Sequence, residues 1–470
     1  MFIIPRLVFH NSFTDLSTSS IAAHGVESTK AMWEAHWSSF LSDADIDFLA
    51  STAHCTSIRL PIGYFTLGPS FTSNTPFDGA ASQIYTSAWS AVLELCARLN
   101  AHGIGTLLDL HALPGGANGN DHGGTSSGKA ELWDNETNLA LATRCLTFIA
   151  GEVHRGNVHG CIGIQLCNEA AWAAEGMYRW YSAVNHSIAM IDDSIPLYIS
   201  DGWDLNTALS WAADANASKG GSSPVVVDTH KYYTFSKEDR DRSAHQIISR
   251  IPTELGEVQA KSGSVVDNGA VQVIIGEWSC VLDSKTWDRS PGDKEEIIRQ
   301  FGKIQQTQWR RRSAGAFFWT ARMQWMDGGE WGFFEMTKKG VVVPPKELGL
   351  SFEDVITKFS RAQQVKSHKR ALAVVSHSRY WNQMTPGGHF EHWRFVQGWD
   401  LGFSDASAFF GMRANGGVQG ARSGGDTIGA LELWIRKRLL DYGQKAEFLW
   451  ELEHGFRQGV RAFEEVVLAD

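Results

Sequence analysis

Short runs of apolar, β-branched residues alternate along the chain with stretches in which apolar residues recur every three to four positions. Between residue 30 and about 350 the second pattern predicts amphipathic helices, such as those at 86–103 and 138–156, each ending in glycine as a helix C-cap would. The runs predict eight strands, at 2–9, 57–62, 105–111, 160–169, 196–201, 224–230, 271–278 and 315–321. Eight strands in alternation with helices indicate an α/β fold, a closed (β/α)8 TIM barrel.

From about residue 361 the pattern changes to a helix-rich tail with glycine-containing joints. The tail includes HFEHWRFVQGWD at 389–400 and ends in an amphipathic stretch, AEFLWELEHGFRQGVRAFEEVV, at 446–467. The sequence therefore predicts a barrel over residues 1–360 and a helical C-terminal extension over 361–470 that packs on it.

Composition narrows the classes of partner. The 470 residues are 43% hydrophobic and 20% charged, which suits a large globular core. The formal net charge of −10 repels phosphate backbones, and the one compact basic run, Arg310–Arg312, falls in a predicted helix, so we expect no nucleic-acid partner. No apolar run reaches about 18 residues, so we expect no membrane span. We expect a monomer that meets a carbohydrate or glycoside substrate.

Cysteines and the start of the chain bear on its compartment. The six cysteines lack CxxC spacing and lie in apolar segments, so we predict buried free thiols. The first residues do not read as a signal peptide, which favours a cytoplasmic protein or non-classical export. Sequons at Asn135, Asn185 and Asn216 leave secretion open.

Polar residues suited to chemistry fall at the carboxyl ends of the predicted strands. They are Arg59, His111, Asn168, Glu169, Asp201, His230, Glu277 and Trp319. In a β/α barrel this rim carries the active site. The sequence therefore predicts one site at the rim, built from several strands.

Glu169 and Glu277 are the predicted catalytic pair. Each ends a buried apolar run, in QLCNEA and IIGEWS, and the two stand on the fourth and seventh predicted strands. Retaining cleavage of a glycosidic bond needs two carboxyl groups about 5–5.5 Å apart, one protonated and one ionised. We expect Glu169 to act as acid/base with a raised pKa, and Glu277 as nucleophile.

The remaining rim residues suit sugar recognition. Asn168 is placed to bond a sugar 2-hydroxyl, and Arg59 to hold Glu277 ionised. His111, His230 and Tyr232 supply hydrogen bonds to hydroxyls and to the nucleophile. Trp319 is expected to lie flat against one face of the sugar. The candidates for stacking on the acceptor side, which the sequence does not rank, are Trp133, Trp172, Trp203, Trp325 and Trp331.

The chain resembles glycoside hydrolase family 5, in the branch of fungal exo-β-1,3-glucanases and related β-glucosidases. The matching stretches are IRLPIGYF, LLDLHALPGGANGNDHGG, GIQLCNEA, VVVDTHKYY, VIIGEWS and FFWTARMQWMDGGEWGFF, in family order over roughly residues 30–345. The resemblance implies a retaining double displacement without metal or organic cofactor. It assigns the acid/base to the Asn168–Glu169 pair and the nucleophile to Glu277. It assigns sugar binding to Arg59, His111, His230, Tyr232 and Trp319.

Two departures from the family pattern change the expected pocket. The family's NEP motif reads NEA, with Ala170, and Pro5 and Arg6 stand where relatives carry an acidic residue that contacts outer sugar hydroxyls. A pocket without that contact would admit a 6-O-substituted glucose. The alternative to an exo-β-glucosidase or exo-β-1,3-glucanase is therefore a diglycosidase that releases rutinose from flavonoid glycosides.

Three other kinds of site would need residues that this sequence lacks or places differently. A non-catalytic carbohydrate-binding barrel would be expected to lack one carboxylate, and both are present. A metal site at His389 and His392 lacks an obvious third ligand, so we predict none. The glycine-rich stretch 115–128 lacks the GK[ST] ending of a phosphate loop and is interpreted as a rim loop on the aglycone side.

Overall fold

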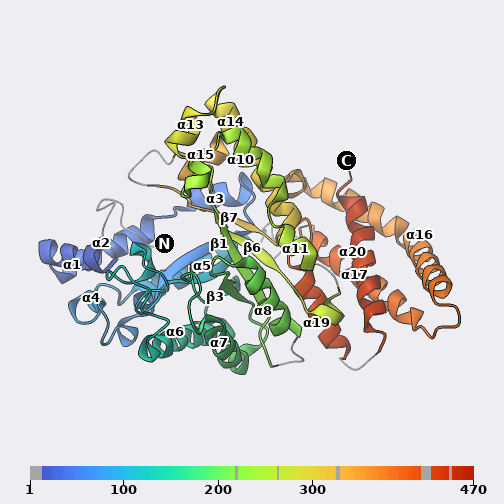
Figure 1. Ribbon diagram of the computed structural model, residues 1–470, viewed down its shortest axis with the longest axis horizontal. Helices are drawn as coiled ribbons and strands as arrows, with labels where there is room; N and C mark the ends of the chain where they lie inside the picture. Colours follow the sequence, from blue (N-terminus) through green and yellow to red (C-terminus); the bar gives the residue numbers. More distant parts are fainter. Residues whose placement is uncertain are drawn as a thin grey trace.

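Seven parallel strands form one sheet whose spatial order follows the chain order (Figure 1). The computed structural model describes residues 13–217, 221–261, 264–323, 329–413, 425–443 and 447–469. The strands are β1 (Ser57–Gly63), β2 (Gly105–Ala112), β3 (Cys161–Gln165), β4 (Leu197–Ser200), β5 (Val225–Lys231), β6 (Val273–Trp278) and β7 (Ala316–Phe318). They make a nearly closed barrel of the predicted type. The strand predicted at 2–9 lies outside the described residues.

Helices connect the strands and cover the outside of the sheet, as expected for βα units. Those before β4 are α1 (Phe13–His24), α2 (Val26–Ser39), α3 (Asp43–Ser51), α4 (Ala80–Gln83), α5 (Ala88–Ala101), α6 (Glu136–His154) and α7 (Met177–Asp192). Those from β4 to β7 are α8 (Leu205–Ala217), α9 (Lys237–Arg240), α10 (Ala244–Arg250), α11 (Gly256–Lys261), α12 (Val265–Asn268), α13 (Ser284–Asp288) and α14 (Lys294–Arg312). After β7 follow α15 (Phe333–Lys338), α16 (Phe352–Met384), α17 (His392–Gly411), α19 (Leu431–Tyr442) and α20 (Leu449–Val467).

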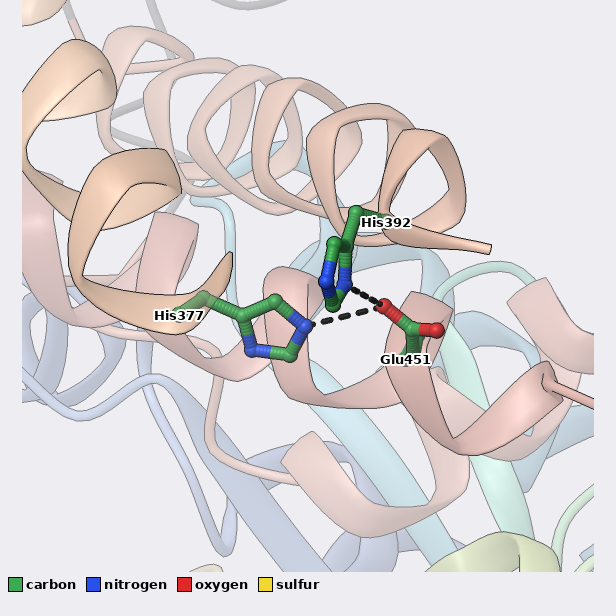
Figure 2. A group of neighbouring side chains, drawn as sticks. All are labelled: His377, His392 and Glu451. Carbon is green, nitrogen blue, oxygen red and sulfur yellow. Dashed lines mark hydrogen bonds and ion pairs between the residues drawn. The ribbon is translucent and has the colours of Figure 1, made fainter. Parts of the chain in front are cut away.

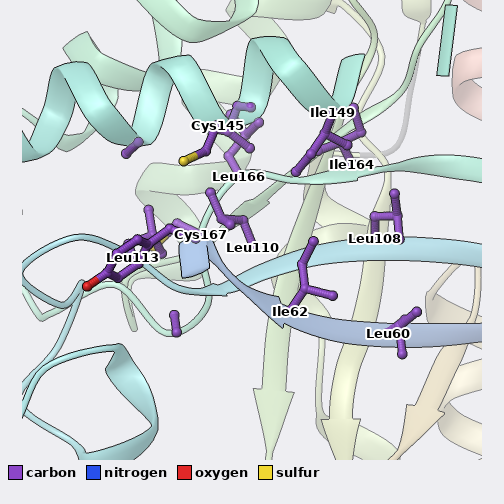
Figure 3. Packing of buried hydrophobic residues seen from close by; sticks show 14 of the residues in the cluster. Leu60, Ile62, Leu108, Leu110, Leu113, Cys145, Ile149, Ile164, Leu166 and Cys167 are labelled. Carbon is purple, nitrogen blue, oxygen red and sulfur yellow. The ribbon is translucent and has the colours of Figure 1, made fainter. Parts of the chain in front are cut away.

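The period-two pattern of the strands separates the core from the polar interior of the barrel. In β2, Leu108 and Leu110 are fully buried and lie beneath Ile149 of α6 (Figure 3). The residues between and after them, Asp109 and His111, are also buried but point to the opposite face, since successive side chains alternate along a strand. The same strand therefore builds the helix-facing core and the wall of the site.

The C-terminal helices α17 and α20 pack unusually close to each other. A Cβ added at Gly398 or Gly402 of α17 would lie 2.0 or 2.1 Å from a backbone oxygen of α20. Gly455 and Gly459 of α20 meet the backbone of α17 in the same way. Only glycine permits this approach, so the glycines expected at joints of the tail instead lie inside helices, at a helix–helix contact.

The helical extension continues the core of the barrel. Leu107, Val226 and Ile274 of three strands belong to the same apolar cluster as the buried side chains of α17, α19 and α20. The Glu453 carboxylate of α20 also accepts hydrogen bonds from the backbone N–H of Val265, at the start of α12. The extension thus packs on the barrel. The division predicted at residue 360 falls inside α16 and stays a prediction.

Several smaller expectations concern surface and compartment. All six cysteines are free thiols, four buried and two half-buried. The sequon residues Asn185 and Asn216 are buried and bonded to backbone groups, so folding hides both, whereas Asn135 is exposed and caps α6. Within the described ranges, no helix has the length and apolar character needed to span a membrane.

Candidate active site

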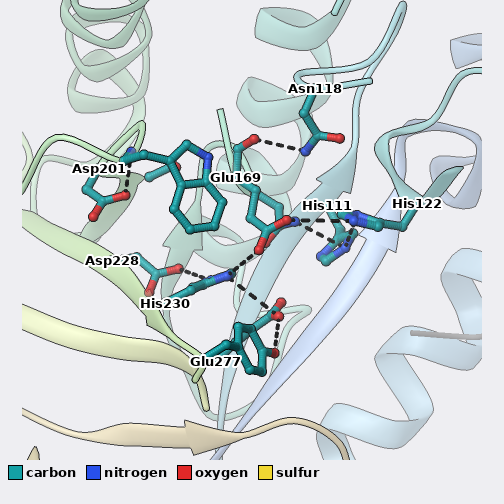
Figure 4. A network of polar contacts seen from close by, with 12 residues as sticks. His111, Asn118, His122, Glu169, Asp201, Asp228, His230 and Glu277 are labelled. Carbon is teal, nitrogen blue, oxygen red and sulfur yellow. Dashed lines mark hydrogen bonds and ion pairs between the residues drawn. The ribbon is translucent and has the colours of Figure 1, made fainter. Parts of the chain in front are cut away.

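Glu169 and Glu277 come together at the carboxyl end of the barrel (Figure 4). Glu277 is the fifth residue of β6, whereas Glu169 lies four residues beyond Gln165, where β3 ends. Three atoms lie within 4.8 Å of one another: one carboxylate oxygen of Glu169, one of Glu277 and a ring nitrogen of His230. This spacing matches the separation of about 5–5.5 Å used in retaining glycosidases.

Arg59 links β6, which carries Glu277, to the end of β3 and the loop after it, which carries Glu169. Arg59 is the third residue of β1 and does not stand at the carboxyl end of the strand, but its long side chain extends toward that end of the barrel. Its guanidinium donates to Glu277 Oε1 at 2.9 Å, to Asn168 Oδ1 at 2.7 Å and to Gln165 Oε1 at 2.7 Å. Asp109 lies 3.0 Å from the same guanidinium. Burial opposes the charge on Arg59, but the carboxylates of Asp109 and Glu277 outweigh it and raise the pKa of Arg59.

His111 is held in one tautomer by its neighbours. Its Nδ1 donates to the Asp109 carboxylate at 2.7 Å, which leaves Nε2 as an acceptor. That nitrogen lies 3.2 Å from the Asn168 amide nitrogen and 3.2 Å from His122 Nδ1. Asn168 is fully buried, so Arg59 and His111 fix both ends of its amide and aim the remaining N–H.

His230 stands between the two glutamates. Its Nδ1 lies 2.8 Å from Glu169 Oε1 and 3.6 Å from Glu277 Oε2, and its Nε2 lies 3.3 Å from Asp228. Burial opposes a charged imidazole, but the carboxylates of Glu277 and Asp228 outweigh it and raise the pKa of His230 well above 6.5. On the other side, the Tyr232 hydroxyl donates to Glu277 Oε2 at 2.8 Å.

The protonation expected for Glu169 from the sequence is wrong. Burial does favour the neutral acid, but the hydrogen bond and charge of His230, with His122 and His111 nearby, lower the pKa of Glu169 to about 2. The sequence pattern predicted the burial but not the histidine pressed against the carboxylate. In the free protein this arrangement favours an ionised Glu169 beside a protonated His230.

The backbone at Glu169 is unusual. Its φ is +42°, in the left-handed region that residues other than glycine rarely adopt. The loop is held by a hydrogen bond from the Asn118 side chain to the Glu169 carbonyl at 2.9 Å. The Ala170 N–H donates to Ser200 Oγ at 3.1 Å, a bond that proline, lacking an N–H, could not make. Ala170 thus adds an anchor to the loop that carries Glu169.

The aromatic residues divide into wall and packing positions. Trp319 lies parallel to His111, with ring centroids 5.9 Å apart, and so borders the site. Trp203 is 49% exposed and stands edge-on to His230, while Trp331 contacts the ring of Tyr232. The other named tryptophans are Trp172, which is 67% exposed, Trp133, which donates to the Ala117 carbonyl, and Trp325, which lies outside the described residues.

Sequence reasoning missed the residues that support the site. Asp109 and Asp228 each stand two positions before a site histidine, in DLH and DTH, and period two places both on the face of their histidine. This repeated Asp-x-His pattern was a usable signal. Asp228 also explains the glycine at position 276, because a Cβ at Gly276 would lie 2.1 Å from Asp228 Oδ1. His122, within the loop read as an aglycone wall, lies 3.7 Å from Glu169.

Asp201 lies at the border of this network, and a large cavity lies away from it. Asp201 accepts from the backbone N–H of Trp203 at 3.0 Å and burial raises its pKa, so it supports the turn after β4. A cavity of about 2350 Å³ is lined by residues that precede β1, β2 and β3, such as His54, Gly103 and His159. None of the predicted site residues lines it, so the chemistry belongs to the opposite end of the barrel.

Comparison with known proteins agrees with this arrangement. The model of the glucan 1,3-β-glucosidase 3 C-terminal domain matches residues 362–467. An uncharacterised glycosyl hydrolase of Saccharomyces cerevisiae is 29% identical over 464 residues, covering 97% of this chain and 85% of that protein. Glucan 1,3-β-glucosidase 3 of Schizosaccharomyces pombe is 28% identical over 442 residues, covering 93% and 86%.

A solved structure supports the fold. The crystal structure of rutinosidase from Aspergillus niger aligns with a TM-score of 0.54 at 18% sequence identity, covering 71% of this chain and 94% of that one. At that identity the likeness concerns the barrel alone. The sequence relatives and the matched C-terminal domain confirm the resemblance predicted from the motifs: the chain is similar to fungal proteins named as a glycosyl hydrolase and as glucan 1,3-β-glucosidase 3.

Proposed function

We propose that the protein is a retaining, exo-acting β-glycosidase that cleaves β-glucosidic bonds of the β-1,3-glucan type, with Glu277 as nucleophile and Glu169 as acid/base. The observation that carries the proposal is the approach of the two carboxylates to within 4.8 Å at the carboxyl end of the barrel. The names of the relatives support the glucan substrate. We also expect the protein to act as a monomer.

In the first step a Glu277 oxygen bonds to the anomeric carbon as the glycosidic C–O bond breaks. The imidazolium of His230, 2.8 Å from Glu169, passes its proton to that carboxylate, which donates it to the leaving oxygen. Arg59 and Tyr232 each bond one oxygen of Glu277, so they aim the carboxylate and support its charge before attack.

In the second step water attacks the same carbon and gives its proton to Glu169, which returns it to His230. The ester bond to Glu277 breaks and the carboxylate returns to its bonds with Arg59 and Tyr232. Two displacements at one carbon restore its configuration. Asn168, whose remaining amide N–H is free of its partners Arg59 and His111, is placed to bond the sugar 2-hydroxyl, and Trp319 to border the sugar ring.

The test follows the anomer and the size of the product by NMR, with laminarin and a flavonoid rutinoside as substrates. We expect β-glucose to appear first from laminarin. First appearance of the α-anomer would contradict the retaining mechanism. Release of intact rutinose, with laminarin untouched, would replace the glucanase by the diglycosidase. Failure to cleave either, with tight sugar binding, would instead favour a non-catalytic binding barrel.

A further inference from the structure

A second cluster of histidines and a carboxylate lies in the C-terminal extension, far along the chain from the rim residues. His377 of α16, His392 at the start of α17 and Glu451 of α20 converge, each from a different helix (Figure 2). His377 Nε2 lies 2.9 Å and His392 Nδ1 2.8 Å from the same oxygen of Glu451. The partners that the sequence did not supply for His392 are His377, on a helix before it, and Glu451, on a helix after it. His389 is not part of the group.

The three groups offer one ligand atom each within a small space. The two nitrogens and the carboxylate oxygen all lie within 4.8 Å of one another. Around a tetrahedral Zn²⁺ with bonds of 2.0–2.1 Å, ligand atoms stand about 3.3 Å apart. The nitrogen–oxygen contacts would widen by only about half an ångström. Two imidazoles and one carboxylate are also a donor set that proteins use for this ion.

Surrounding contacts fix the orientation of each donor. The Phe395 ring stacks on His377 at 3.9 Å between centroids, and the Phe390 ring lies parallel to His392 at 5.2 Å. The backbone N–H of Glu391 donates to the other oxygen of Glu451 at 2.7 Å. Such outer contacts, which hold ligands in a set orientation, accompany metal ligands in proteins.

Charge distinguishes this cluster from its neighbours on α20. Glu451 is fully buried, and the ion-pair partners found for it among the described residues are imidazoles. Two positions on, Glu453 pairs with Arg457 at 2.7 Å. A buried carboxylate needs a compensating charge, and imidazoles supply one only when they are protonated. A divalent cation would both compensate the charge and use all three donors.

We propose that His377, His392 and Glu451 form a structural Zn²⁺ site that ties together helices α16, α17 and α20. The nitrogen of each imidazole that faces the ion must be unprotonated: a neutral ring carries its proton on the other ring nitrogen, and an imidazolium releases one proton to solvent. The site is separate from the barrel mouth and takes no part in sugar cleavage. Mg²⁺ prefers all-oxygen ligands, so this donor set selects against it.

The test uses the full-length protein, stripped of metal by a chelator and dialysed. Zn²⁺ binding is measured by calorimetry and by metal analysis, and the melting temperature by scanning with Zn²⁺ or Mg²⁺ present. We expect one Zn²⁺ per chain, a melting temperature that rises with Zn²⁺ and not with Mg²⁺, and sugar cleavage that survives the chelator below the melting range. Absence of stoichiometric Zn²⁺ binding to the wild-type chain would overturn the proposal whatever the variants do.

Variants locate the ion. His392→Ala is expected to weaken Zn²⁺ binding by at least about 100-fold, since loss of an outer contact alone costs 10- to 100-fold. His389→Ala, an exposed histidine nearby, is the matched control and should bind as wild type. Equal weakening in both would contradict the site. Binding that is lost in Glu277→Gln and kept in His392→Ala would place the ion in the barrel mouth and overturn the proposal as well.

Discussion

The barrel mouth and the C-terminal extension each gather histidine and carboxylate side chains, but with opposite balances of charge. Around His230 lie Glu169, Glu277 and Asp228, and the adjacent Arg59 supplies a permanent cation. In the extension two histidines face a single carboxylate. The first arrangement shares a proton among several acids, whereas the second places two imidazoles against one buried carboxylate.

The elements that carry the two clusters differ as well. The mouth is built from strand ends and a strained loop, where backbone geometry varies freely from residue to residue, as the φ of Glu169 shows. The cluster of the extension stands between packed helices with aromatic rings on both imidazoles. Similar side chains thus carry out catalysis in the barrel mouth and, in our proposal, hold helices together in the C-terminal extension.

The largest effect is expected from Glu277→Gln. Removing the nucleophile should lower kcat by at least about 10⁴-fold, the order seen when a catalytic nucleophile is lost. Steady-state kinetics on laminarin measures it. The matched control is Glu335→Gln, which replaces a helical glutamate paired with Lys339 outside the site and should leave kcat unchanged. A Glu277→Gln variant with near-normal activity would show that the cluster in the barrel mouth does not carry the catalytic nucleophile.

A smaller effect is expected from His230→Gln. In the wild type the shared proton is held by His230, whose pKa is raised, so the alkaline limb of kcat/KM lies well above pH 6.5. In the variant the proton must rest on Glu169 without the imidazolium, and it leaves at lower pH. The alkaline limb should therefore move to lower pH, with about 10²- to 10⁴-fold less activity at neutral pH. His245→Gln, exposed on α10, should keep the wild-type profile; an unmoved limb in His230→Gln would refute the shared proton.

Gly455→Ala tests the extension without touching the mouth. The new Cβ would lie 2.0 Å from the Phe395 carbonyl oxygen, so α17 and α20 must separate. We expect a loss of about 1–3 kcal/mol in the free energy of unfolding, with kcat normal below the melting range. Gly256→Ala, whose Cβ meets nothing within 4 Å, is the control and should be nearly neutral. Equal stability of the two variants would show that the close contact does not hold the helices.

The smallest effect concerns Glu464, a half-buried acid of α20. Burial, with Asp426 nearby, raises the pKa of Glu464 to about 7. The fold thus favours the neutral acid, and stability falls as pH rises from 4.5 to 7. Glu464→Gln should stabilise the protein at pH 8 by about 1–2 kcal/mol and leave it unchanged at pH 4. Thermal unfolding at both pH values measures this, with exposed Glu465→Gln as control. A stabilisation independent of pH would contradict the assigned titration.

Sequence patterns predicted the elements whose residues repeat at regular spacing. The seven described strands and the pairing of Arg59 with Glu277 follow from alternation and from residue chemistry. The pKa of Glu169 did not follow, because it depends on contacts with His230 and His122 from other segments. Nor did the partners of His392, since His377 and Glu451 are separated from it by 15 and 59 residues. Contacts between distant segments carry no local signature in one sequence.

In the proposed mechanism Glu277 bonds covalently to the sugar, and Glu169 donates and accepts the proton. A 2-deoxy-2-fluoroglucoside with a good leaving group slows breakdown of the covalent intermediate, so that the labelled enzyme can be digested and its peptides sequenced by mass spectrometry. We predict one label per chain, on Glu277 in the peptide that contains VIIGEWS. A label on another residue, or an enzyme that hydrolyses the reagent with inversion and never accumulates a label, would contradict the account.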